Sequence, residues 1–178
     1  MDFVNFKNLV LNRQSCRDFI PKKVEEEKLL QLCDVGRLAP SACNSQPWTM
    51  YAVTTEEKIT EVKNALQDNG RNQFLNNAGG FIALCEKEAT LKPDVENKFS
   101  KNHFVKYDIG ELIAYITLCA KTMGLESCII GYVNHQKINQ ALNIEDGEVC
   151  NIVIALGYSD CPIREKVRKL PSQIIKKI

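Results

Sequence analysis

The sequence lacks the features that mark several large classes of protein. Its 178 residues carry a net charge of only +1, which gives no support to a general nucleic-acid-binding role. No apolar run approaches the roughly 20 residues needed to span a bilayer, so we expect no membrane association. Residues 1–7 have neither the basic start nor the apolar block of a secretion signal. We therefore expect a cytoplasmic protein.

Internal repeats, low-complexity tracts and Gly/Ser linkers are also missing, so nothing divides the chain into separate units. Hydrophobic residues make up 44% and charged residues 25%, which is ordinary for a globular protein. A chain of this length buries roughly 70% of its unfolded surface. We expect one domain over residues 1–178.

The cysteines form no C-x-x-C pair, and their spacing matches no zinc or iron–sulfur ligand pattern. We therefore expect no metal site. Most of them sit inside apolar runs, which favours buried free thiols over a disulfide framework and fits a reducing compartment. The eight are Cys16, Cys33, Cys43, Cys85, Cys119, Cys128, Cys150 and Cys161.

Apolar periodicity predicts four main helices and four strands. The helices are expected over 2–12, 24–38, 54–66 and 104–123, and the strands over 48–54, 79–86, 127–132 and 149–157. Asp2, Thr54 and Asn134 are expected to cap helices, Phe3, Phe6 and Val10 to form an apolar face, and residues 87–102 to be a polar surface excursion. Helices and strands do not alternate regularly and no G-x-G-x-x-G follows a strand, so an α+β fold is favoured over a Rossmann sheet.

Two polar stretches stand out from this pattern. If residues 13–17 are extended, Arg13, Ser15 and Arg17 project to one side, and two guanidinium groups beside a hydroxyl suit a phosphate. The plainer alternative is a pair of solvated surface arginines. Residues 40–48 (Pro-Ser-Ala-Cys-Asn-Ser-Gln-Pro-Trp) read as a rigid loop with surplus hydrogen-bonding groups, or simply as a turn between a helix and a strand.

Together these stretches resemble the signatures of a known family. Arg13-x-Ser15-x-Arg17-x-Phe19, followed by Pro40-Ser41-x-x-Asn44-x-Gln46-Pro47-Trp48, looks like the nitroreductase family of FMN-dependent oxidoreductases. Residues 124–131 (Gly-Leu-Glu-Ser-Cys-Ile-Ile-Gly) and 153–158, with the basic residues ahead of Leu170-Pro171, are similar to its later markers. The similarity thus runs through nearly the whole chain in the family's order.

The resemblance implies a three-layer α+β fold, with a central, mostly antiparallel sheet flanked by helices, in an intertwined homodimer that binds FMN at its interface. Arg13 and Ser15 would lie near the FMN phosphate and ribityl chain, with Gln14 beside them through its backbone. Arg17 would lie toward the N1/O2 edge of the flavin ring. The resemblance also assigns residues further along the chain to FMN. Pro40, Ser41, Ala42 and Asn44 would come from the second subunit, and Ile130 and Gly131 would offer backbone N–H groups near N5 and O4. Asn72 is assigned to the pyrimidine edge, with Arg71 and Gln73 as alternatives, and Arg168 or Lys169 to the phosphate.

The activity implied is transfer of reducing equivalents from NADH or NADPH to an electron-poor acceptor, such as a nitroaromatic or a quinone, by a ping-pong mechanism. FMN would supply the chemistry, so no catalytic side chain is named. His103 and His135 have no evident acid–base partner, which favours surface or capping roles. Alternatives are a non-catalytic FMN storage or sensor protein, a specialised reductive member of the same superfamily, and a thiol-based redox protein suggested by the cysteine count.

Overall fold

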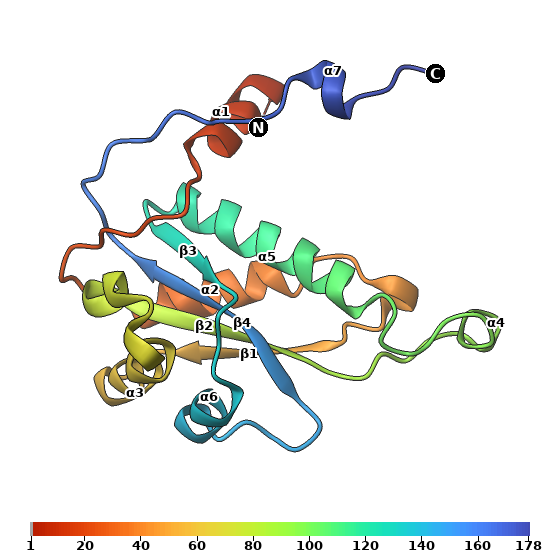
Figure 1. The fold of residues 1–178 in the computed structure, drawn as a ribbon, viewed down its shortest axis with the longest axis horizontal. Coiled ribbons are helices and arrows are strands. Elements are labelled where there is room, and N and C mark those ends of the chain that lie inside the picture. Colours follow the sequence, from red (N-terminus) through yellow and green to blue (C-terminus); the bar gives the residue numbers. More distant parts are fainter. Residues whose placement is uncertain (1) are drawn as a thin grey trace.

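A computed structural model describes residues 2–178 as an antiparallel sheet covered by helices on both faces (Figure 1). The strands follow the order β1-β2-β4-β3, and every neighbouring pair is antiparallel. The strands are β1 (Trp48–Val53), β2 (Gly80–Glu86), β3 (Glu126–Ile130) and β4 (Val149–Gly157). The helices are α1 (Phe3–Asn12), α2 (Glu26–Gly36), α3 (Glu56–Leu66), α4 (Pro93–Glu96), α5 (Val105–Thr122), α6 (His135–Leu142) and α7 (Pro171–Ile174). Single 3-10 turns lie at η1 (Ala42–Asn44), η2 (Asp68–Gly70) and η3 (Gln73–Asn77).

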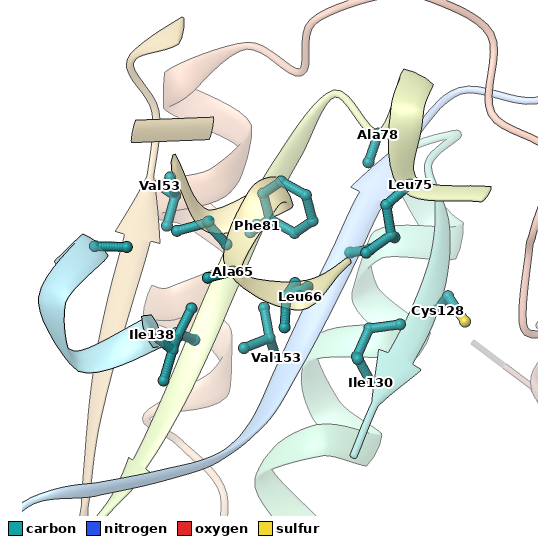
Figure 2. Packing of buried hydrophobic residues seen from close by; sticks show 14 of the residues in the cluster. Val53, Ala65, Leu66, Leu75, Ala78, Phe81, Cys128, Ile130, Ile138 and Val153 are labelled. Carbon is teal, nitrogen blue, oxygen red and sulfur yellow. The ribbon is translucent and has the colours of Figure 1, made fainter. Parts of the chain in front are cut away.

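Alternation of side chains along the two central strands, interrupted by one register shift between Leu84 and Cys85, produces three layers. On β2, Phe81 and Ala83 face one hydrophobic cluster, while Ile82 and Leu84 face the other. Figure 2 shows the first cluster, in which Phe81 and its neighbours pack under α3, α6 and η3. The second cluster lies between the sheet and the helices α2 and α5. The expected α+β class with a central antiparallel sheet is therefore confirmed.

The helix ends follow local chemistry. Asp2 caps α1 by accepting from the backbone N–H of Asn5 at 2.8 Å, and Asn134 caps α6 in the same way. The expected cap of α3 was wrong by one residue, because the hydroxyl of Thr55, not Thr54, accepts from the N–H of Lys58. Gly124 ends the α5 segment with a φ of +73°, a conformation that glycine adopts without steric cost.

Two features of burial do not follow from the sequence pattern. The apolar face of α1 is not covered, since Phe3 is 76% exposed and Phe6 48% exposed. Residues 87–102 are not purely a polar excursion, because Ala89 and Leu91 are buried against the α5 side of the sheet and α4 forms within the segment. Both features arise because burial depends on which distant segments pack against a residue. Within residues 2–178, no helix combines the length and apolarity required to cross a membrane.

Candidate functional site

The segment that follows α1 runs alongside β3 in an extended conformation. Ser15 forms a parallel bridge with Ser127, and the N–H of Cys16 donates to the Ser127 carbonyl at 2.9 Å. Gln14 and Cys16 are buried, whereas Arg13, Ser15 and Arg17 are turned outward. This is the alternation expected of an extended segment, and it presents the two guanidinium groups and the hydroxyl on one side.

The C-terminal tail lies against this segment. Arg164 donates to the side-chain oxygen of Gln14 from its backbone N–H at 3.1 Å and from Nε at 3.2 Å. Its Nη2 also donates to the Ser15 carbonyl at 2.6 Å, and Lys166 Nζ contacts the Arg13 carbonyl. The buried Gln14 side chain therefore fixes the tail beside the segment that the sequence analysis singled out.

A basic cavity of about 320 Å³ forms where the two segments meet. Arg17, Arg164 and Arg168 line it together with Ser15 and Glu165. The lining also includes Arg13, Gln14, Lys166 and Val167.

The electrostatics of this cavity suit an anion. Burial first, and then the neighbouring arginines, hold the pKa of Lys166 below its ordinary value, which indicates a surplus of positive charge. Nη1 of Arg13 is buried without a hydrogen-bond partner within the described chain. A buried guanidinium donor without an acceptor is costly, and a phosphate group would supply one. The residues present thus fit a phosphate-bearing ligand.

The rim of the cavity continues to η3 and to the end of β3. The Arg17 guanidinium lies 5.8 Å from the centre of the Phe74 ring, and that of Arg71 lies 4.2 Å from the Tyr132 ring. Gly131 directly precedes Tyr132 and follows Ile130, the last residue of β3. A surface from Arg17 to Gly131 therefore extends beside the basic cavity.

The residues on this rim differ in how tightly packing and hydrogen bonds within the chain constrain them. A Cβ added at Gly131 would meet only Ile152 Cδ1, at an ordinary 3.7 Å, so packing within one chain does not demand a glycine there. Ile130 is buried and pairs with Val153. The side chain of Asn72 donates to the Leu66 carbonyl at 2.8 Å, so its amide nitrogen caps the end of α3.

The loop over residues 40–47 lies at the other end of α5. The N–H of Ala42 donates to Asp108 in the first turn of α5 at 3.1 Å. Ser15, by contrast, pairs with Ser127, just after the C-terminal end of α5. An α-helix of 18 residues is about 27 Å long, so the two stretches stand far apart in one chain, as Figure 1 shows.

Sequence reasoning missed part of the basic cavity. The sequence pattern marks Arg164 and Lys166 only as part of a basic tail, yet both lie in the lining with Arg168, while Lys169 is not among the lining residues. The signal was present, because Arg164, Lys166 and Arg168 alternate and would share one side of an extended segment. The second missed feature is the side chain of Gln14, which binds the tail.

Among the residues that the structure describes, no histidine or cysteine lines the basic cavity. Nδ1 of His135 lies 2.9 Å from the Cys150 carbonyl at the start of α6. His103 is exposed within an aromatic group, 4.7 Å from the Phe99 ring centre and 4.6 Å from that of Phe104. All eight cysteines of the described chain are free thiols, and half of them are buried.

Comparison with known proteins places the chain in one family. The profile described as the nitroreductase family matches residues 10–158. The chain is 24% identical to the NADPH-flavin oxidoreductase of Vibrio harveyi, over 93% of this chain and 70% of that protein. It is 25% identical to the oxygen-insensitive NADPH nitroreductase of Helicobacter acinonychis, over 92% and 91% of the two chains.

Solved structures share the fold over almost the whole chain. A nitroreductase family protein from Streptococcus pneumoniae superposes with a TM-score of 0.83 at 23% identity, covering 97% of this chain and 100% of the other. A nitroreductase family protein from Clostridium difficile gives a TM-score of 0.80 at 26% identity, covering 99% and 98%. Because the family profile spans most of the sequence and the fold agrees, this chain belongs to the nitroreductase family.

Proposed function

We propose that the protein is an FMN-dependent NAD(P)H oxidoreductase that works as a homodimer. The basic cavity beside Arg13 carries this proposal, because its surplus positive charge and the unpartnered Arg13 Nη1 suit the phosphate of a bound mononucleotide. The names of relatives in Vibrio harveyi and Helicobacter acinonychis, a flavin oxidoreductase and a nitroreductase, support the class of reaction.

Different residues around the cavity would contact different parts of the cofactor. Arg13, Ser15 and Arg168 would hold the phosphate and ribityl chain, with Arg164 and Lys166 adding positive charge. Arg17, at the rim toward Phe74, would lie along the pyrimidine edge of the ring. Ile130 and Gly131 would offer backbone N–H groups to the ring at the end of β3. We assign Asn72 to the same edge by family resemblance, and Lys169 to the tail as a weaker partner than Arg168, which lines the cavity.

Bound FMN would supply the redox chemistry between NADH or NADPH and a second substrate, and the two half-reactions would share one site in ping-pong order. The protein's part is to bind, orient and provide charge. The Arg17 guanidinium, as a rigid hydrogen-bond donor, would stabilise negative charge at the pyrimidine edge. Acceptors that fit this scheme are electron-poor molecules such as nitroaromatics and quinones.

A second copy of the chain would complete the site. The loop that contains Pro40, Ser41, Ala42 and Asn44 stands at the far end of α5 from the cavity, so one chain cannot bring both to one flavin. The uncovered apolar residues of α1 and the tail, such as Phe3 at 76% and Val167 at 86% exposure, offer a surface for that copy. We therefore expect an obligate dimer whose chains each contribute to both sites.

A complementation experiment tests this arrangement. Arg13→Ala damages the cavity of its own chain, and Ala42→Phe places a bulky group on the loop of the other. A heterodimer of the two, isolated with two different affinity tags, should contain one intact site and bind about half the FMN of the wild-type dimer. Each variant homodimer should bind FMN weakly.

The heterodimer also supplies its own control. If both halves of a site came from the same chain, neither chain of the heterodimer would hold an intact site, and FMN binding would stay as weak as in the homodimers. Sedimentation of the wild-type protein should report a dimer that does not dissociate on ordinary dilution. We place this enzyme in the cytoplasm, where free thiols such as those seen here persist.

A further inference from the structure

The loop after α2 has a strained backbone over residues 43–46. Cys43, Asn44 and Gln46 have φ values of 54°, 53° and 49°, in the left-handed region that side-chain-bearing residues rarely adopt. Residues with a side chain are sterically disfavoured there, and this conformation persists only where the surroundings hold it. Three left-handed residues within four positions thus require an anchor.

Hydrogen bonds within the loop supply part of that anchor. Ser41 Oγ accepts from the Gln46 N–H at 2.9 Å, and the Ser41 carbonyl accepts from the Asn44 N–H at 2.9 Å. Two side-chain contacts tie the loop to the rest of the protein. Ser45 Oγ accepts from the Thr90 N–H at 2.6 Å, and Thr90 is an exposed residue between the buried Ala89 and Leu91. Asp108 Oδ1 accepts from the Ala42 N–H, and this contact connects the loop to the core helix α5.

Asp108 stands in an unfavourable environment for a residue of its type. It is only 5% exposed, and its Oδ2 is buried with no hydrogen-bond partner in the described chain. Burial raises the pKa of its carboxyl group above the ordinary aspartate value. A half-satisfied buried carboxyl destabilises a fold. The presence of Asp108 beside the strained loop is explained if its bond to the Ala42 N–H holds the loop in its conformation.

We propose that Asp108 is a positioning residue that holds the Ala42 backbone and thereby the strained turn over Cys43–Gln46 in the form that meets the flavin of the second subunit. This inference rests on the proposed function and deepens it, because it assigns the shape of the flavin-facing wall to a residue that does not touch the flavin. The loop leads directly into Trp48, the single tryptophan of the chain, which is 9% exposed. Trp48 therefore reports on the loop whether or not flavin is bound.

The experiment compares four single variants of the full-length protein and one double variant, Asp108→Ala with Ala42→Pro. Asp108→Ala removes the acceptor, Asp108→Asn keeps Oδ1 as an acceptor, and Ala42→Pro removes the donor from the other side of the same bond. Thr117→Val is the matched control, because Thr117 is an equally buried polar residue of α5 whose hydroxyl bonds only within the helix, to the Ile113 and Ala114 carbonyls. Acrylamide quenching of Trp48 in the flavin-free protein and FMN affinity are measured for each, together with the unfolding midpoint.

We expect Asp108→Ala and Ala42→Pro each to increase Trp48 quenching and to weaken FMN binding about tenfold or more. The double variant should be no worse than either single one, because both remove the same bond. Asp108→Asn should restore most of the FMN affinity, and Thr117→Val should leave both readouts unchanged. Should Asp108→Ala fail to fold, Ala42→Pro and Asp108→Asn make the same comparison.

Two results would overturn the inference. One is unchanged Trp48 quenching in Asp108→Ala and Ala42→Pro, which would mean that the bond does not hold the loop. The other is increased quenching with unchanged FMN affinity, which would mean that the loop does not face the flavin. If the wild-type protein binds no FMN at all, the proposed function fails. The quenching of Trp48 would still show whether Asp108 holds the loop.

Discussion

The side-chain oxygen of Gln14 accepts two hydrogen bonds from Arg164, one from its backbone N–H at 3.1 Å and one from Nε at 3.2 Å. The Gln14 amide also donates to the Pro162 carbonyl at 3.2 Å. Gln14 is only 6% exposed, so these bonds lie out of competition with water. One buried amide therefore connects the segment after α1 with the C-terminal tail, and these two segments form the basic cavity.

Gln14→Ala should release the tail. Without the amide, Arg164 loses two of its contacts, and we expect trypsin to cleave after Arg164 and Lys166 faster than in the wild type, with weaker FMN binding. Gln31→Ala, on the exposed face of α2, is the control and should change neither. An unchanged cleavage rate in Gln14→Ala would show that other contacts hold the tail.

Arg13→Ala should weaken FMN binding by about 2–3 kcal/mol, because it removes a charge-assisted contact to the phosphate. Titration of the flavin-free protein with FMN, followed by flavin fluorescence, measures the change. Arg37→Ala is a fair comparison, since Arg37 is an exposed arginine whose bond is to Asp34 in α2. Equal FMN affinity in Arg13→Ala and the wild type would make Arg13 an ordinary surface residue.

Phe81→Ala should destabilise the fold by about 3–5 kcal/mol, because Phe81 is fully buried on the central strand β2 and its ring fills the layer under α3 (Figure 2). Urea unfolding measures the loss. Leu38→Ala, at a residue that is 60% exposed, should change stability by less than about 0.5 kcal/mol. Similar losses in the two variants would contradict the assigned packing.

Glu148 should make stability depend on pH. Although burial alone raises its pKa, hydrogen bonds from Lys87, Thr49 and Tyr51 hold the pKa of this carboxylate below its ordinary value. A lowered pKa means that the contribution is complete above about pH 4.3, the unfolded value, and fades as the pH falls through the folded value. At neutral pH, Glu148→Gln should cost about 2–3 kcal/mol.

The measurement is urea unfolding of wild type and Glu148→Gln across this pH range. The difference in unfolding free energy should be constant from neutral pH down to about pH 4.3 and should then shrink. A difference that stays the same in acid would show that the carboxylate charge does not stabilise the fold.

The elements that the sequence predicted well are those whose burial is decided locally. The run Val149–Gly157 was expected as a strand and is β4 with the same bounds, because nearly every residue is apolar and both faces of the sheet are covered. Asn134 and Gly124 were found because capping depends on a few neighbouring residues.

What escaped prediction depends on contacts between distant segments. The burial of Ala89 and Leu91 follows from packing against α5, which the polar residues around them conceal. The inward side chain of Gln14 and its bond to Arg164, 150 residues away, leave no local signal. In α1 the sequence correctly predicts the helix and its apolar face. No other segment of the described chain covers that face, so it stays exposed.

The central claim is most directly tested by the visible absorption spectrum of the purified protein before and after NADH or NADPH is added without oxygen. We predict the bands of a bound flavin, bleached by at least one of the two donors and restored by an electron-poor acceptor. A flavin that neither donor bleaches would indicate a storage or sensor protein instead of an enzyme. A colourless protein that cannot be reconstituted with FMN would contradict the account altogether.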